Sequence, residues 1–234
     1  MDDAELARRS ILGFGEMVAA LGGDGALRRS DAIGARVDDA AQNHWLDAAV
    51  VPVDATPPAD DPGLPHCLWT VAGTVPGRRE EAGIAMPCMG LVLDGVPPAA
   101  PGDAIEVEEP SLAVLGEVND RAYGQVGQLA PLVRVLRDAR VRTHGVRLDG
   151  GFACVALTLR VGDDVSIQYV ATEQRFRRQG LASRLLVAVL GRVAATGATS
   201  ATLQASPDGL PVYERLGFRR VATLRAHLRD PAVG

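Results

Sequence analysis

Residues 169–186 read YVATEQRFRRQGLASRLL and place a cluster of arginines between two apolar segments. Upstream, residues 166–172 (SIQYVAT) are rich in the β-branched and aromatic residues that favour a strand. Downstream, residues 179–197 (QGLASRLLVAVLGRVAATG) have apolar positions at helical spacing and stop at a glycine. The pattern predicts a strand, a sharp basic turn and a long helix.

The turn has the composition of an anion-binding loop. Gly180 permits a sharp backbone turn and lets a ligand approach the main-chain N–H groups closely. Amides at the start of a helix have no partner within it and lie at the positive end of its dipole. A pyrophosphate suits such a position. The side chains around the glycine are small, basic or polar, namely Ala182, Arg177, Arg178 and Ser183.

A solvated turn and a nucleic-acid-binding patch are the other interpretations of this arginine cluster. The chain has 24 basic residues, all of them arginine, against 29 acidic residues, which gives a net charge of −5. Only Phe176 accompanies the cluster, whereas nucleic-acid surfaces interleave aromatic and basic residues over a whole face. We therefore expect no nucleic-acid partner, and the 47% hydrophobic content indicates a globular chain.

Strands and helices alternate around this loop. A short strand is predicted at residues 104–109, and a helix with Ser111 as its N-cap follows. The remaining segments are a helix at 129–139, three strands within 141–172, a strand at 200–206, a short helix at 209–217 and a last strand at 218–228. This order predicts an α/β (α+β) fold with a mixed sheet flanked by helices.

The Pro/Gly-rich residues 93–103 suggest a boundary between two units, 1–97 and 103–230, with 98–102 as the linker. The first unit reads as a helix at 4–22 and strands within 44–53 and 66–73. It also contains a faint echo of the second unit, because REEAGI (79–84) resembles YERLGF (213–218) at a matching distance from a strand. The echo predicts a short helix at 79–84 and a smaller, degenerate copy of the second unit.

The three cysteines, Cys67, Cys88 and Cys154, are widely spaced and indicate reduced, buried thiols of a cytoplasmic protein. His66 lies beside Cys67, but no fourth residue has typical spacing for a metal ligand, so we expect no metal. The N-terminus has no signal-peptide pattern, and no apolar run reaches the ~20 residues of a membrane span. We expect no membrane partner.

The segment Arg177-x-x-Gly180-x-Ala182 resembles the Q/R-x-x-G-x-G/A loop of the GCN5-related N-acetyltransferases (GNAT). Two flanking segments strengthen the resemblance: VAT (170–172) lies just upstream, and LQASPDGLPVYERLGF (203–218) lies downstream. The similarity covers about residues 103–230. It implies the GNAT acyl-CoA N-acyltransferase fold, with acetyl-CoA as co-substrate and an amine as acceptor.

The resemblance also implies roles for individual residues. The splayed strand would hold the pantetheine arm and acetyl carbonyl through Val170, Ala171 and Thr172. The diphosphate would lie on Arg177, Arg178, Gln179, Gly180, Leu181, Ala182 and Ser183. Tyr213 occupies the tyrosine position of the family, near the CoA sulfur, where a phenol could protonate the departing thiolate. A purely packing role beside Leu216 and Phe218 is the alternative for this tyrosine.

The general base is not identified by the sequence. The family often places a glutamate on the splayed strand, but residues 166–169 read SIQY. The remaining candidates are Glu173, Glu117, Asp120 and His144. Gln174 replaces the usual proline, and the first unit lacks the loop, so we expect that unit not to bind CoA.

The sequence thus predicts an enzyme that moves an acetyl group from acetyl-CoA to a primary amine of a small molecule or peptide, in a ternary complex. The acidic net charge favours a cationic amine. The alternative is a catalytically silent, CoA-binding regulatory or scaffold protein. We expect a monomer or a homodimer.

Overall fold

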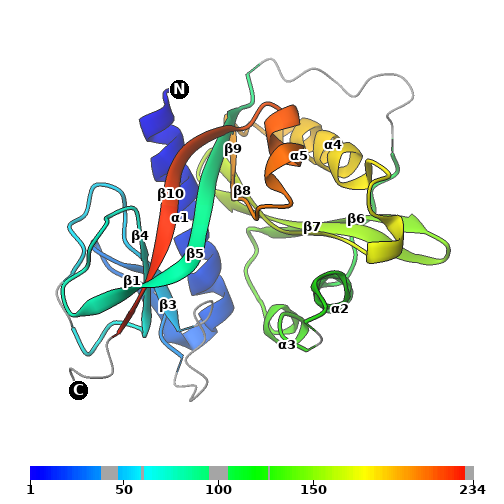
Figure 1. Ribbon diagram of the computed structural model, residues 1–234. Helices are drawn as coiled ribbons and strands as arrows, with labels where there is room; N and C mark the ends of the chain where they lie inside the picture. The colour runs from blue at the N-terminus through cyan, green and yellow to red at the C-terminus, as the bar shows by residue number, and fades with distance from the viewer. Residues whose placement is uncertain (38–46, 59–60, 95–104, 126, 230–234) are drawn as a thin grey trace. The chain divides into compact units, whose positions relative to one another are not determined.

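The computed structural model describes residues 1–37, 47–58, 61–94, 105–125 and 127–229 (Figure 1). The chain forms two compact units, and each unit combines segments that are far apart in the sequence. Unit 1 comprises Met1–Gly90, Gln204–Pro207 and Arg219–Gly234, and unit 2 comprises Leu91–Leu203 and Asp208–Phe218. The predicted linker 98–102 lies outside the described residues. None of the described helices is long and apolar enough to cross a membrane.

Unit 1 is a mixed sheet packed against one long helix, α1 (Asp3–Gly22). The order of its strands is β1-β2-β3-β4-β10-β5, and only the β3–β4 pair is parallel. Their bounds are β1 Ala26–Arg28, β2 Ile33–Ala35, β3 Ala48–Val50, β4 Cys67–Thr70, β5 Arg78–Val92 and β10 Arg219–Arg229, and a 3₁₀ turn, η1 (Gly23–Gly25), follows α1. The core forms where α1 packs on the sheet, with the rings of Phe14 and Trp69 edge to face at 5.8 Å.

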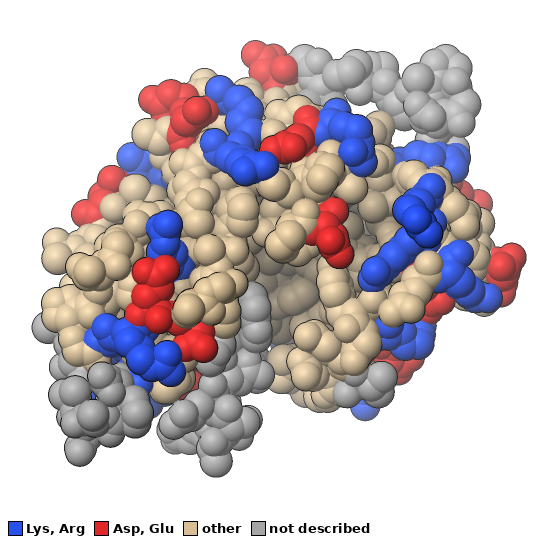
Figure 2. All heavy atoms as spheres, viewed as in Figure 1, with Lys and Arg blue, Asp and Glu red and all other residues tan. Residues whose placement is uncertain are grey.

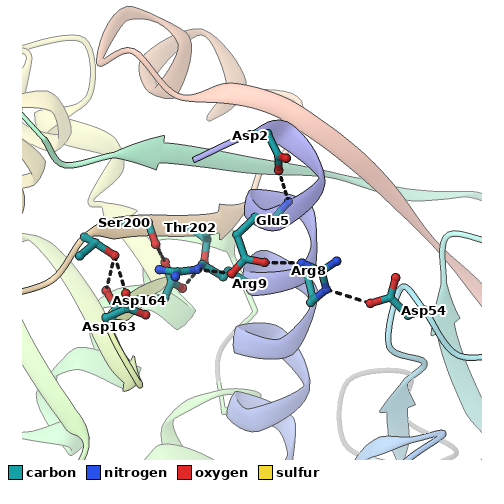
Figure 3. Close-up of polar contacts among 10 residues, drawn as sticks. Asp2, Glu5, Arg8, Arg9, Asp54, Asp163, Asp164, Ser200 and Thr202 are labelled. Atoms are coloured by element: carbon teal, nitrogen blue, oxygen red, sulfur yellow. Dashed lines mark hydrogen bonds and ion pairs between the residues drawn. The ribbon is translucent and has the colours of Figure 1, made fainter.

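The sequence of α1 determines where this helix begins. Asp2 is the N-cap, and its side chain accepts a hydrogen bond of 2.8 Å from the N–H of Glu5 (Figure 3). Glu5 also forms ion pairs with Arg8 and Arg9 one turn along the helix. The predicted helix at 4–22 is confirmed.

The predicted short helix at residues 79–84 is wrong. These residues belong to β5, which pairs with β10 from Arg78↔Arg229 to Gly90↔Arg219. Gly83 has a φ of +82° and lies where the register shifts, so it accommodates a bulge and does not end a helix. Ladder hydrogen bonds to a strand far away in sequence override the weak local preference of these residues for a helix. The similarity between residues 79–84 and 213–218 in sequence is therefore not matched by a short helix in both segments.

Unit 2 has the strand order β9-β8-β7-β6, in which β8 and β9 are parallel and the other pairs antiparallel. The strands are β6 Val141–Leu148, β7 Gly151–Val161, β8 Asp164–Thr172 and β9 Ser200–Gln204. The helices are α2 Leu112–Tyr123, α3 Ala130–Arg134, α4 Leu181–Ala195 and α5 Leu210–Arg215, with a 3₁₀ turn, η2, at Gln174–Phe176. Helix α4 packs on one face of this sheet and α2 on the other (Figure 1).

Most of the elements predicted for residues 103–230 are confirmed. Ser111 caps α2 by accepting from the N–H of Val114, and the long helix ends just before Gly197. The strand predicted at 104–109 is wrong, because the described part of this segment, residues 105–109, forms only an isolated bridge between Glu108 and Gly145. The bridge lies on the edge of β6 opposite β7, where the N–H and carbonyl of Glu108 bond to the carbonyl and N–H of Gly145.

His144 is a buried residue of β6, with 6% of its surface exposed. Its Nε2 lies 2.9 Å from Oγ1 of Thr158, and Nδ1 has no hydrogen-bond partner among the described residues. Burial, and secondarily the positive charges of Arg192 and Arg142, lower the pKa of His144 from 6.5 to about 4. The imidazole is therefore neutral in the folded protein at neutral pH.

We expect His144 to make the fold acid-sensitive. Because its pKa is lower in the folded state, the unfolded chain binds the proton more tightly, and stability is lost as the pH falls from 6.5 toward 4. This residue should remove about 2 kcal/mol of unfolding free energy between pH 7 and pH 5. Urea unfolding at both pH values should show the loss in the wild type and a correspondingly smaller loss in His144→Asn. Equal losses in both proteins would contradict this assignment.

Candidate functional site

The two parallel strands of unit 2 separate partway along their length. Strands β8 and β9 pair from Asp164↔Ser200 to Ile167↔Leu203, and from Gln168 onward β8 pairs only with β7. The buried carboxylate of Asp164 accepts hydrogen bonds from the hydroxyls of Ser200 and Thr202 (Figure 3). These contacts fix the paired end, so the strands diverge toward residues 168–172.

The main-chain groups of Val170 and Thr172 lie on the side of β8 that has no ladder partner. The N–H of Glu173 donates to the carbonyl of Ala153 on β7 at 2.9 Å, so alternate residues along the strand direct their main-chain groups away from β7. Two contacts agree with this orientation. The Val170 carbonyl accepts from the hydroxyl of Tyr123 at 3.2 Å, and the Thr172 carbonyl accepts from Nε of Arg177 at 3.2 Å.

The loop after β8 turns through two left-handed residues, Arg178 (φ +61°) and Gly180 (φ +74°). A Cβ added to Gly180 would meet no atom within 4 Å, so the space beside this backbone is open. Helix α4 begins at Leu181 with no side-chain cap, and its first internal hydrogen bond runs from the N–H of Arg184 to the carbonyl of Gly180. The amides of residues 181–183 precede that bond and form the N-terminal turn that suits an anion.

The three arginines of the loop have three different environments. Arg175 lies 4.4 Å from the centre of the Phe176 ring and pairs with Glu173 at 3.6 Å. Arg177 donates to the carbonyls of Thr172 and Ala122. The side chain of Arg178 makes no hydrogen bond or ion pair with any residue that the structure describes. On the face drawn in Figure 2, basic and acidic side chains are interspersed.

The three tyrosines of the chain all belong to unit 2: Tyr169 lies in β8 itself, and Tyr123 and Tyr213 lie on α2 and α5. Tyr213 on α5 is 8% exposed, and its ring packs edge to face on Phe218 with the centroids 6.0 Å apart. Burial raises the pKa of Tyr213, and the nearby Tyr123 and Cys154 raise it further. The sequence interpretation missed Tyr123, although an exposed aromatic residue at the end of a predicted helix is a signal for a binding surface.

Two of the candidate bases have other roles in the structure. The carboxylate of Glu173 accepts from Arg121 at 2.8–2.9 Å and also pairs with Arg175. Asp120 is buried, and its carboxylate accepts from backbone N–H groups within residues 127–130. Glu117 lies exposed on α2. The carboxylates of Glu173 and Asp120 are thus engaged in structural contacts, and the geometry assigns the role of base to none of these candidates.

The cysteines are buried, as the sequence predicts. Cys67 and Cys88 belong to the apolar core of unit 1, and burial raises the pKa of each thiol to about 12. In unit 2, Cys154 accepts a hydrogen bond of 3.2 Å from the hydroxyl of Thr172. Within the described part of the chain, His, Cys, Asp and Glu side chains form no group that could hold a metal ion.

Comparisons with known proteins agree with this geometry. Residues 133–227 match the sequence model of a family described as the acetyltransferase (GNAT) domain. A putative GNAT acetyltransferase from Novosphingobium aromaticivorans is 21% identical, with a TM-score of 0.58 over 93% of this chain and 97% of that one. A GCN5-related N-acetyltransferase from Kribbella flavida is 19% identical, with a TM-score of 0.59 over 94% and 96% of the chains. No curated protein matches the sequence significantly.

Proposed function

We propose that this chain, whose residues 133–227 match the acetyltransferase (GNAT) domain, transfers an acetyl group from acetyl-CoA to a primary amine of a small molecule or peptide. The observation that carries the proposal is the pairing of two features at one end of β8. The main-chain groups of Val170 and Thr172 lack ladder partners, and the uncapped N-terminus of α4 follows after a short loop.

Acetyl-CoA suits this arrangement chemically. Its diphosphate would bind at residues 177–183, where the loop amides and the helix dipole favour negative charge. Its pantetheine arm would run along β8 at residues 170–172, and a strand N–H there would stabilise the developing oxyanion. The open space beside Gly180 supports this assignment, because a close approach to the backbone is needed.

The proposed reaction is a direct attack. The neutral amine attacks the thioester carbonyl, a C–N bond forms, and the C–S bond breaks when the tetrahedral intermediate collapses. The thiolate takes a proton from Tyr213, the amine nitrogen gives up its proton to water, and solvent returns a proton to the phenolate of Tyr213. Holding both reactants in one cleft supplies much of the rate enhancement. Burial keeps the phenol of Tyr213 protonated over the physiological range, and the same raised pKa makes it a weaker acid toward the thiolate.

A panel of cationic amines tests the proposal. Spermidine, kanamycin and a short peptide with a free N-terminus would each be incubated with acetyl-CoA, and release of free thiol would be measured. We expect calorimetry to detect CoA binding and at least one amine to be acetylated. Absence of CoA binding would overturn the proposal.

A silent CoA-binding regulatory or scaffold protein is the second candidate. The observation in its favour is that the carboxylates of Glu173 and Asp120 are already engaged with arginine and backbone donors. Such a protein would show thermal stabilisation by CoA and no turnover of any amine, whereas the enzyme would show both.

A further inference from the structure

Arg177 is the first residue of the loop motif, yet its side chain is engaged away from the loop. Its Nε donates to the carbonyl of Thr172, and its Nη2 donates to the carbonyl of Ala122. Thr172 ends β8, and Ala122 is the penultimate residue of α2. One guanidinium thus joins a helix and a strand that are 50 residues apart in sequence.

Among the residues that the structure describes, neither of the two carbonyls has a partner within its own helix or strand ladder. At the end of α2, the N–H groups of Gly124 and Gln125 bond to the carbonyls of Arg121 and Asp120, which leaves the Ala122 carbonyl for Arg177. The last carbonyls of a helix have no partner within it and lie at the negative end of its dipole, which favours a cation there.

The Thr172 carbonyl also lacks a ladder partner, but for a different reason. It lies beyond the last β8–β9 pair, Ile167↔Leu203, and on the side of β8 away from β7, so the ladder offers it no partner. Hydrogen bonds from a charged donor to such carbonyls are stronger than those from a neutral donor. Arg177 therefore stabilises a helix end and the splayed strand at once.

Two further contacts join the same end of α2 to β8 and to the loop after it. Arg121 pairs with Glu173, and the Tyr123 hydroxyl donates to the carbonyl of Val170. Three consecutive residues of α2, 121–123, are thus each bonded to the end of β8 or the loop after it. We call this set of contacts the α2–β8 clasp, and the guanidinium of Arg177 lies at its centre.

We propose that Arg177 is a positioning residue that holds the end of α2, with Tyr123, against the splayed end of β8, and that Arg178 is the arginine that meets the diphosphate. The second part rests on the proposed function. With Nε and Nη2 engaged, Arg177 keeps only part of its donor fork for a ligand. Arg178 has its whole guanidinium available and lies two residues before Gly180, beside the first amides of α4.

The clasp has a consequence for catalysis. The Tyr123 hydroxyl lies at the carbonyl of Val170, in the strand that would hold the thioester. Release of α2 would move this phenol and the adjoining surface away from the thioester strand. Loss of Arg177 should therefore impair the encounter with the amine more than the affinity for CoA.

Matched variants of the two arginines separate these roles. Arg177→Ala and Arg178→Ala each remove one exposed guanidinium from the same loop. We expect Arg177→Ala to speed hydrogen exchange of the amides in residues 119–125 by at least about 10-fold, because the helix end frays. Its Kd for CoA should stay within about threefold of the wild type. Arg178→Ala should leave that exchange unchanged and raise the Kd by about 10-fold.

Kinetics with the best amine of the panel give a readout that fold stability alone would not move. Arg177→Ala should raise KM for the amine or lower kcat by about 10-fold while KM for acetyl-CoA is kept. The kinetic constants of Arg177→Lys should lie between those of the wild type and Arg177→Ala, because a single ammonium bonds to two carbonyls less well than the forked guanidinium does.

The proposal is overturned if exchange in 119–125 is the same in Arg177→Ala and the wild type, or if Arg177→Ala weakens CoA binding as much as Arg178→Ala. Failure of the proposed function is a separate result, in which the wild type binds no CoA. The exchange measurement still decides the role of the clasp in that case.

Discussion

Replacement of Gly180 by Asp is expected to weaken the affinity for CoA by at least about 100-fold, or about 2.7 kcal/mol. Gly180 precedes the first turn of α4, and the space beside its Cα is open, so an added side chain would project into the region proposed for the diphosphate. A carboxylate there would repel the phosphates and itself satisfy the free amides. Titration calorimetry of both proteins with CoA measures the change.

Gly180→Asn is the matched control, because it has the same shape as Asp without the charge. Both substitutions place a side chain at a φ of +74°, a left-handed conformation that asparagine and aspartate tolerate better than most residues. The strain should therefore be similar in both variants, and the melting temperatures should agree. Equal CoA affinities for Gly180→Asp and the wild type would show that the diphosphate does not bind at this loop.

Tyr213→Phe is expected to lower kcat by about 100-fold while the Kd for CoA stays within about twofold. The phenylalanine ring keeps the edge-to-face contact with Phe218, so the substitution removes a hydroxyl and little packing. If the phenol protonates the thiolate, its loss affects the chemical step and not the binding of CoA. Single-turnover measurements with saturating acetyl-CoA would isolate that step.

The pH dependence gives an independent check on Tyr213. Its pKa is raised above 10 by burial and by the neighbouring Tyr123 and Cys154, so the phenol remains protonated up to pH 10. The wild-type rate should rise as the amine loses its proton and show no descending limb below pH 10. Tyr123→Phe is the control, because it removes the neighbouring phenol. A larger loss of kcat in Tyr123→Phe than in Tyr213→Phe would indicate that Tyr123 is the general acid.

Local patterning predicted most of the C-terminal elements because short-range signals specify them. Ser111 caps α2, and Gly197 follows the end of α4, as propensity and capping rules predict. The helix predicted at 79–84 failed, since those residues form ladder bonds with β10. A segment of weak local preference adopts the structure that its tertiary partner imposes.

The candidate site likewise contains residues that the sequence pointed to and residues that only the structure brought together. The sequence predicted a sharp turn at Gly180, because a glycine between a strand and a helix has a local conformational meaning, whereas Tyr213 was singled out by the resemblance to the GNAT family. It did not separate Arg177 from Arg178, and it did not find Tyr123. Those assignments depend on α2, which precedes the loop by about 50 residues and which no local pattern relates to it.

The amino-acid order alone determined the succession of strands and helices after residue 110, and the glycine that lets the chain turn into α4. Only the tertiary structure decided which carbonyls are left without partners and which side chain reaches them. Hydrogen-bond partners at the ends of helices and strands come from elements distant in the chain. Their identity is therefore a property of packing, whereas turns and caps are encoded within a few neighbouring residues.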